Sequence, residues 1–140
     1  DIRNGRTYMY HQGPVLYPFG YGLSYSDFAY EKIESFKQDK KNIRVTVSVK
    51  NTSGRDGEEV VQLYASYPDS KVERPSKQLR AFRRIPIKAG ETRKVTLTVP
   101  KEELGYWNEG KQMFVVEPGT VKLLIGASSE DIRLEGKIRL

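Results

Sequence analysis

From residue 28 to the end of the chain, apolar and polar side chains alternate with a period of two, and short turn sequences interrupt the alternation. Within residues 42–51 (NIRVTVSVKN) every second residue is apolar: Ile43, Val45, Val47 and Val49. Successive side chains of a β-strand point to opposite faces, so this pattern predicts a strand with one buried face. Two further segments have the same pattern, with Val61, Leu63 and Ala65 and then Val95, Leu97 and Val99 expected to face inward.

Three other segments have less simple patterns. In residues 132–140, at the end of the chain, Ile132, Leu134, Ile138 and Leu140 are expected to face the core, and Arg133, Glu135, Lys137 and Arg139 to face water. In residues 79–87 the apolar residues do not fit a strict period of two; they are Leu79, Phe82, Ile85 and Ile87. A bulge or bend near Arg83 would turn all of them inward. Residues 101–104, followed by Gly105, predict one short helical turn.

The whole pattern indicates about seven or eight short strands, with turns about every 8 to 12 residues and no amphipathic helix of useful length. Antiparallel sheets can keep one face in water, which accounts for the clean alternation. The sequence therefore predicts an all-β fold, an immunoglobulin/fibronectin type III-like antiparallel β-sandwich that follows an extended N-terminal segment.

That segment contains a stretch unlike the rest. Residues 14–25 (PVLYPFGYGLSY) carry no charge, in a chain in which 30% of the residues are charged. Its two prolines and two glycines disfavour a helix or a central strand, so we expect an extended, turning conformation. Its large apolar side chains belong to Leu16, Tyr17, Phe19, Tyr21, Leu23 and Tyr25. They must lie against this domain's own core, a ligand or another domain.

The sequence contains few of the cysteine and histidine residues that catalytic sites commonly use. The chain has no cysteine and one histidine, His11, so we expect no disulfide, metal site or cofactor. Pairs of carboxylates can hydrolyse glycosidic bonds, and three such pairs are adjacent in sequence: Glu58 with Glu59, Glu102 with Glu103, and Glu130 with Asp131. Adjacent strand residues point to opposite faces, so we expect no catalytic residue among them.

The net charge of +6 raises the question of a nucleic-acid partner. The densest basic run holds Arg80, Arg83 and Arg84, whereas elsewhere basic and acidic residues alternate. We therefore expect no nucleic-acid partner, and binding to an anionic polymer remains a less favoured alternative. No apolar run approaches the ~20 residues of a membrane span, so no membrane association is expected.

Two smaller signals concern sugars. Asn51-Thr52-Ser53 matches the N-glycosylation sequence and lies in a predicted turn, where Asn51 is expected to be accessible. Tyr106 and Trp107 are adjacent, and their rings could stack on a sugar. Packing against the domain is the favoured interpretation of this Trp.

Several blocks occur here in a familiar order: PVLYPFGYGLSY, VKNTSGRDGEEVVQLY, ERPSKQLRAFRRI, KAGETRKVTLTV and FVVEPGTVKLLIGASSEDIRL. Together they resemble the carboxy-terminal part of glycoside hydrolase family 3 enzymes, the β-glucosidases and β-xylosidases. The resemblance spans essentially the whole chain and implies a fibronectin type III-like sandwich. In that family the nucleophilic aspartate lies in a Ser-Asp-Trp-like motif of a separate barrel. Ser26-Asp27-Phe28 resembles it only superficially, because it follows the lead-in to the sandwich, so no catalytic residue is carried over.

The resemblance implies a domain organisation and a role. Residues 1–27 are expected to be a linker from the preceding catalytic domain, with the six apolar residues of the 14–25 stretch forming an interdomain interface, and residues 28–140 to be the sandwich. The chain itself would be noncatalytic, and would stabilise the catalytic domains of a retaining β-glycosidase that acts on terminal β-D-glucosides or β-D-xylosides.

Further expectations concern partners and location. The expected partners are the catalytic domains of the same polypeptide, with oligosaccharide near the interface, and a homodimer through the linker when the domain is isolated. The main alternative is a carbohydrate-binding module that uses Tyr64, Tyr67, Tyr106 or Trp107. The chain begins without a methionine, and we expect a piece of a longer bacterial protein that is periplasmic or extracellular.

Overall fold

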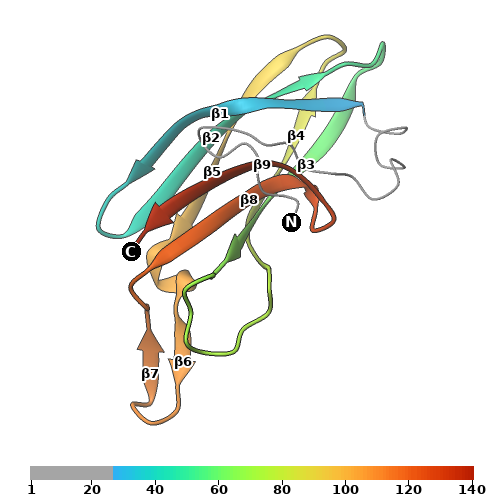
Figure 1. The fold of residues 1–140 in the computed structure, drawn as a ribbon. Coiled ribbons are helices and arrows are strands. Elements are labelled where there is room, and N and C mark those ends of the chain that lie inside the picture. Colours follow the sequence, from blue (N-terminus) through green and yellow to red (C-terminus); the bar gives the residue numbers. More distant parts are fainter. Residues whose placement is uncertain (1–26) are drawn as a thin grey trace.

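The computed structural model describes residues 27–140, which form a β-sandwich (Figure 1). One sheet has the strand order β1-β2-β5 and the other β4-β3-β8-β9. The first sheet contains β1 (Phe28–Gln38), β2 (Asn42–Asn51) and β5 (Thr92–Pro100). The second contains β3 (Gly57–Ser66), β4 (Gln78–Ile87), β8 (Thr120–Ser128) and β9 (Asp131–Arg139). All neighbouring strands are antiparallel, so the predicted fold class is confirmed.

The core lies between the two sheets and contains the alternating side chains of the central strands. Ile43, Val45, Val47 and Val49 of β2 are fully buried, as are Val61, Leu63 and Ala65 of β3. The predicted inward faces of these strands are confirmed, and so is that of β5, whose Val95, Leu97 and Val99 are at most 1% exposed. The predicted helical turn is also present, as the short 3-10 helix η2 (Lys101–Leu104).

A bulge in β9 changes the pattern predicted for that strand. Ile125 pairs with Leu134 and Gly126 with Ile132, which leaves Arg133 as the extra residue. The bulge therefore turns Ile132 to the outer face of the sheet, where it packs with Leu124 instead of joining the main core. A Cβ on Gly126 would lie 2.0 Å from the Asp131 carbonyl oxygen, so only glycine fits opposite the bulge.

Glu135 and Arg133 are further departures in β9. Both were expected to face water, but Glu135 is 4% exposed and the Arg133 side chain is 10% exposed. Glu135 pairs with Leu124 across the sheet, and the ammonium nitrogen of Lys122 lies 3.9 Å from its carboxylate. A polar residue at an outward position is thus buried beside the apolar Leu124.

The prediction for β4 was wrong at Leu79 and Phe82. These side chains are 45% and 63% exposed, although Ile85 and Ile87 are buried as expected. The bulge occurs at Arg80, since Leu63 pairs with Ala81 and Tyr64 with Leu79. Because this bulge precedes Phe82, the strand is regular from Phe82 to Ile85. Residues three positions apart then point to opposite faces, so the Phe82 ring faces outward when Ile85 faces the core.

Asn51 is not accessible, so the expectation of an exposed glycosylation site was wrong. The side chain is fully buried at the end of β2. Its amide nitrogen donates to the carbonyl oxygens of Arg55 (2.8 Å) and Ile87 (2.9 Å), and its oxygen accepts bonds from the backbone and hydroxyl of Ser53. Asn51 therefore holds the β2–β3 turn together.

Some predictions fall on residues that the structure does not describe. These include His11, residues 1–26 of the predicted linker, and the interface residues Leu16, Tyr17, Phe19, Tyr21, Leu23 and Tyr25. Within the described range, no helix has the length and apolar character needed to cross a membrane.

Candidate functional site

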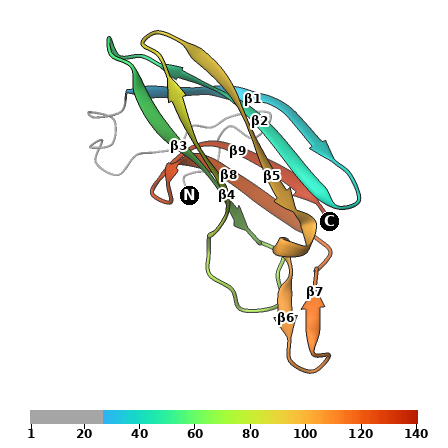
Figure 2. The ribbon, with the colours of Figure 1, turned by 180° about the vertical axis from the view of Figure 1, so that it is seen from behind.

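A two-stranded arm projects from one end of the sandwich (Figure 2). It consists of β6 (Tyr106–Asn108) and β7 (Met113–Val115), which pair antiparallel. Gly105 lies at its base, where an added Cβ would approach the Val115 carbonyl oxygen to 2.6 Å. Any larger residue would push the two strands of the arm apart.

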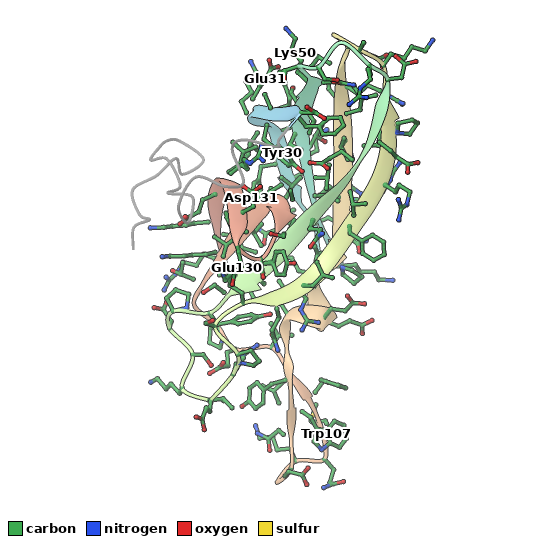
Figure 3. All side chains as sticks on the ribbon, turned by 90° about the vertical axis from the view of Figure 1, so that its right-hand side faces the viewer. Tyr30, Glu31, Lys50, Trp107, Glu130 and Asp131 are labelled. Carbon is green, nitrogen blue, oxygen red and sulfur yellow. The ribbon has the colours of Figure 1, made fainter. Side chains whose placement is uncertain are left out.

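The arm carries the predicted sugar-contact residues, Tyr106 and Trp107. Trp107 is 45% exposed and lies far from Lys50 at the opposite end of the molecule (Figure 3). Its ring meets Phe114 edge to face, with centroids 5.4 Å apart and an angle of 77°. The Tyr106 ring instead faces the guanidinium of Arg74, 5.3 Å away. The rings do not form one flat platform, and the sugar contact stays a prediction.

Arg74 attaches the long β3–β4 loop to the base of the arm. Its side chain is 6% exposed and forms an ion pair with Glu117 at 2.6 Å. A second guanidinium nitrogen donates to the Leu104 carbonyl oxygen at 3.0 Å. The guanidinium also lies 3.8 Å from the centroid of the Tyr67 ring, which is a cation–π contact. One side chain thus joins the loop, η2 and the segment after β7.

Glu117 receives hydrogen bonds from three groups of this loop. The Ser70 hydroxyl donates at 2.6 Å and the Lys71 backbone at 3.0 Å, in addition to the Arg74 bond. These bonds, with that of Ser70 the largest cause, lower the pKa of Glu117 to about 2. No sequence pattern predicted the Arg74–Glu117 pair, because its members lie 43 residues apart in irregular segments.

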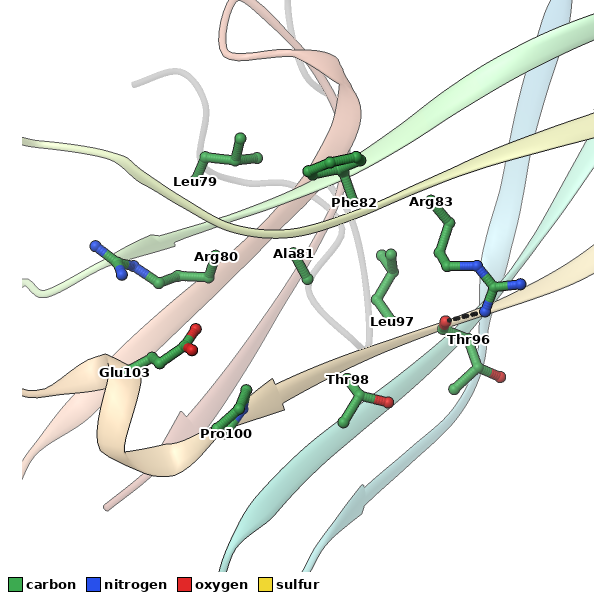
Figure 4. Close-up of a pocket in the computed structure, with 10 residues that line it drawn as sticks. All are labelled: Leu79, Arg80, Ala81, Phe82, Arg83, Thr96, Leu97, Thr98, Pro100 and Glu103. Carbon is green, nitrogen blue, oxygen red and sulfur yellow. Dashed lines mark hydrogen bonds between the residues drawn. The ribbon is translucent and has the colours of Figure 1, made fainter.

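Two hollows adjoin the arm and share Arg80 and Glu103. The first lies on the open side between the edge strands β4 and β5, and Figure 4 shows Arg80 and Glu103 at one end of it. The second is a groove between the β3–β4 loop, η2 and the arm, where Tyr106, Trp107 and Phe114 supply its aromatic wall. Together they form one continuous surface of mixed polar and aromatic character.

The basic residues of β4 do not converge on one site. Arg84 is exposed and pairs with Glu58 at 3.1 Å. Arg83 donates to the Thr96 carbonyl oxygen across the open edge at 3.4 Å (Figure 4). Arg80 lines the two hollows. Each guanidinium thus has a different neighbourhood, which does not favour binding to an anionic polymer.

Two of the three adjacent carboxylate pairs have separate surroundings, whereas Glu102 and Glu103 lie on η2 and both line the groove beside the arm. Glu58 is at the surface, whereas Glu59 accepts a 2.8 Å bond from the Tyr30 hydroxyl, and burial raises the pKa of Glu59. Asp131 is held by Arg133 through bonds of 2.7 and 2.8 Å, while Glu130 remains exposed. Within residues 27–140, no group of three or more His, Asp or Glu side chains is placed to hold a metal ion.

Arg133 also fixes the point where the chain enters the sandwich. One of its guanidinium nitrogens donates to the Phe28 carbonyl oxygen at 2.7 Å. Its guanidinium carbon lies 5.1 Å from the centroid of the Tyr30 ring. The bulged residue of β9 therefore holds the beginning of β1 beside the edge of the second sheet.

A family model described as the fibronectin type III-like domain matches residues 59–129. The chain belongs to the fibronectin type III-like family. The matched residues run from β3 through β8 and include Arg74, the arm and Glu117. Loop, arm and sandwich strands are thus all parts of a fibronectin type III-like domain.

This fibronectin type III-like domain is also similar to segments of much longer proteins. It is 41% identical over 128 residues to thermostable β-glucosidase B from Acetivibrio thermocellus, covering 89% of this chain and 17% of that protein. A crystal structure of a β-glucosidase from Kluyveromyces marxianus in complex with glucose matches with a TM-score of 0.78 and 38% identity, over 90% of this chain and 15% of that one. A GH3 β-glucosidase from Bifidobacterium adolescentis matches with a TM-score of 0.77 and 36% identity, over 89% of this chain and 18% of the other.

These matches confirm the resemblance to the fibronectin type III-like part of glycoside hydrolase family 3 enzymes. The chain spans less than a fifth of the length of each of these relatives. It therefore corresponds to one domain of a multidomain polypeptide.

Proposed function

We propose that this fibronectin type III-like chain is a noncatalytic accessory domain of a β-glucosidase, and that it stabilises the catalytic domains of the same polypeptide by packing against them. The supporting observation is its alignment with less than a fifth of proteins that are themselves named β-glucosidases. A terminal β-D-glucoside or β-D-xyloside is the substrate class that we assign to the parent enzyme.

The arrangement of the carboxylates supports a noncatalytic role. A retaining glycosidase needs two carboxyl groups ~5 Å apart on either side of the scissile bond. Here Glu59 is engaged by Tyr30 and Asp131 by Arg133, and neither lines the hollows beside the arm. Glu102 and Glu103, which do line the groove, are adjacent exposed residues of η2. Chemistry on the substrate is therefore assigned to the remainder of the parent polypeptide.

The proposal is tested by comparing the 140-residue chain with the parent polypeptide. We expect the chain alone to release no product from an aryl β-glucoside or aryl β-xyloside. We expect the parent enzyme to lose activity on heating several times faster when residues 28–140 are removed. Hydrolysis by the purified chain that Glu59→Gln abolishes would contradict the noncatalytic part of the proposal. Equal rates of heat inactivation would contradict the stabilising part.

The carbohydrate-binding alternative is tested with Trp107, which is the single Trp of the chain. Cellobiose or xylobiose is titrated while the fluorescence of Trp107 is recorded, with Tyr106→Ala as the second sample. A saturable change that Tyr106→Ala weakens would favour a sugar site in the arm. A location outside the cytoplasm stays a prediction.

A further inference from the structure

The outer face of the four-stranded sheet carries an apolar row that crosses its strands. Leu79 of β4 pairs with Tyr64 of β3, and Tyr64 pairs with Leu124 of β8. Ile132 of β9, turned outward by the bulge, packs with Leu124. We call Leu79, Tyr64, Leu124 and Ile132 the outer row. The three-stranded sheet covers the opposite face, and no strand described for residues 27–140 lies over the outer row (Figures 1 and 2).

Two polar side chains beside the outer row, those of Tyr64 and Gln62, are bonded within the face. The Tyr64 hydroxyl donates to the side-chain oxygen of Gln62. The amide nitrogen of Gln62 donates to the Ala127 carbonyl oxygen at 3.0 Å. The exposed apolar surface of the outer row belongs mainly to Leu79, which is 45% exposed, since Leu124 and Ile132 are 9% and 5% exposed. Glu135, with Lys122 3.9 Å from its carboxylate, lies opposite Leu124 on the same face.

The chain enters the sandwich next to this face. Arg133, the bulged residue beside Ile132, holds the Phe28 carbonyl oxygen at 2.7 Å. Neighbouring strands lie ~4.8 Å apart, so the three spacings from β9 to β4 amount to roughly 14 Å. An extended chain covers ~3.3 Å per residue, so about five residues reach from one edge of the sheet to the other. The residues just before Phe28 are thus close enough to cross the outer row.

We propose that the outer row is the docking surface for residues 16–25 of the same chain. This stretch is uncharged and rich in Tyr, Phe and Leu, and it ends three residues before Phe28. Its apolar side chains match the apolar side chains of the outer row. Part of the predicted interdomain interface therefore packs on the sandwich itself. The inference does not rest on the proposed function, because both partners belong to this chain.

The absence of cysteine from the chain makes a cross-linking test direct. Tyr64→Cys is combined, one at a time, with cysteine at Leu16, Tyr17, Phe19, Tyr21, Leu23 or Tyr25 in the full 140-residue chain. The control series pairs the same positions with Thr98→Cys, on an exposed position of β5 in the other sheet. Under mild oxidation, we expect at least one intramolecular disulfide to form tenfold faster or more with Tyr64→Cys than with Thr98→Cys. Equal rates in the two series would overturn the proposal.

A second measurement leaves one cysteine and changes the segment. The thiol of Tyr64→Cys is expected to react with a maleimide at least tenfold faster when the six apolar residues are replaced by serine, with the Thr98→Cys rate unchanged. Circular dichroism checks that the serine variant keeps its strands. An unchanged rate for Tyr64→Cys would overturn the proposal. Slow reaction of the Tyr64→Cys thiol only at concentrations where sedimentation shows dimers would also overturn it, since a second copy would then occupy the face. So would slow reaction of this thiol only with added cellobiose.

Discussion

The ion pair between Arg74 and Glu117 allows a quantitative test of how the arm is held. Arg74→Met keeps much of the side-chain volume and removes the guanidinium. Removing one member of a buried ion pair costs about 3–5 kcal/mol, because the remaining charge is left without its partner. The Glu117 side chain is 17% exposed and keeps its bonds from Ser70 and Lys71, which favours the lower end. We therefore expect the free energy of unfolding to fall by about 3 kcal/mol.

The assay is urea unfolding of the full chain, followed by circular dichroism. With a slope of about 2 kcal/mol per molar urea, the midpoint should fall by about 1.5 M. Arg84→Met is the matched control, because Arg84 also forms an ion pair with a glutamate, Glu58, but at the surface, with side chains 66% and 52% exposed. Exposed pairs contribute less than about 1 kcal/mol, so its midpoint should move little. Equal shifts for the two variants would refute the reasoning.

The effect should also depend on pH. Hydrogen bonds from Ser70, Lys71 and Arg74 lower the pKa of Glu117 to about 2, from 4.5. Because the pKa is lower in the folded state, this stabilisation is complete above about pH 4.5 and is lost as the pH falls towards 2. The difference between the native chain and Arg74→Met should therefore be full at neutral pH and shrink below pH 4.5. A difference that stays constant down to pH 2 would show that lost packing, and not the charge, causes the effect.

Four other predictions test the core, the β2–β3 turn, the buried carboxylate of Glu59 and the exposed arm. Leu63→Ala should lower the free energy of unfolding by about 2–5 kcal/mol, whereas Phe82→Ala, at a 63% exposed position, should change it by less than about 0.5 kcal/mol in the same urea titration. Asn51→Ala should lower the free energy of unfolding by about 2–3 kcal/mol, because it leaves buried carbonyl groups without a hydrogen-bond donor. Thermal unfolding measures this change. Burial raises the pKa of Glu59, so ionising this carboxyl at higher pH destabilises the native chain but not Glu59→Gln. The free energy of unfolding of Glu59→Gln minus that of the native chain should therefore increase as the pH rises through that pKa, and a pH-independent difference would contradict this. Trp107 should be quenched efficiently by acrylamide, since its side chain is 45% exposed, and a shielded Trp would contradict the exposed arm.

The alternation of apolar residues predicted the sandwich and most of its core. In β2 and β3, which lie between two neighbours, the period of two places alternate apolar side chains inside, and Val47 and Leu63 are fully buried. The edge strands β4 and β9 did not follow the pattern. Each carries a bulge, at Arg80 and at Arg133, that shifts the direction of the side chains on one side of it. The residue pattern does not specify where an extra residue is inserted.

The candidate site was less accessible to sequence reasoning. Tyr106 and Trp107 could be singled out because rings are conspicuous in a sequence, yet their separate surroundings depend on Arg74 and Phe114. The prediction that Asn51 is exposed was wrong because a turn residue was assumed to face water. In the structure its amide is the hydrogen-bond partner of a strand that follows much later in the chain.

The sequence by itself therefore determined the class of fold, the central strands and the family, because these depend on local alternation and on ordered blocks of residues. Only the tertiary structure decided which charges are buried in pairs, where the bulges lie and which apolar side chains face outward. Those features arise from contacts between residues far apart in the chain, such as Arg74 with Glu117 and Arg133 with Phe28. No local periodicity encodes such contacts, since each partner is selected only once the two sheets have packed together.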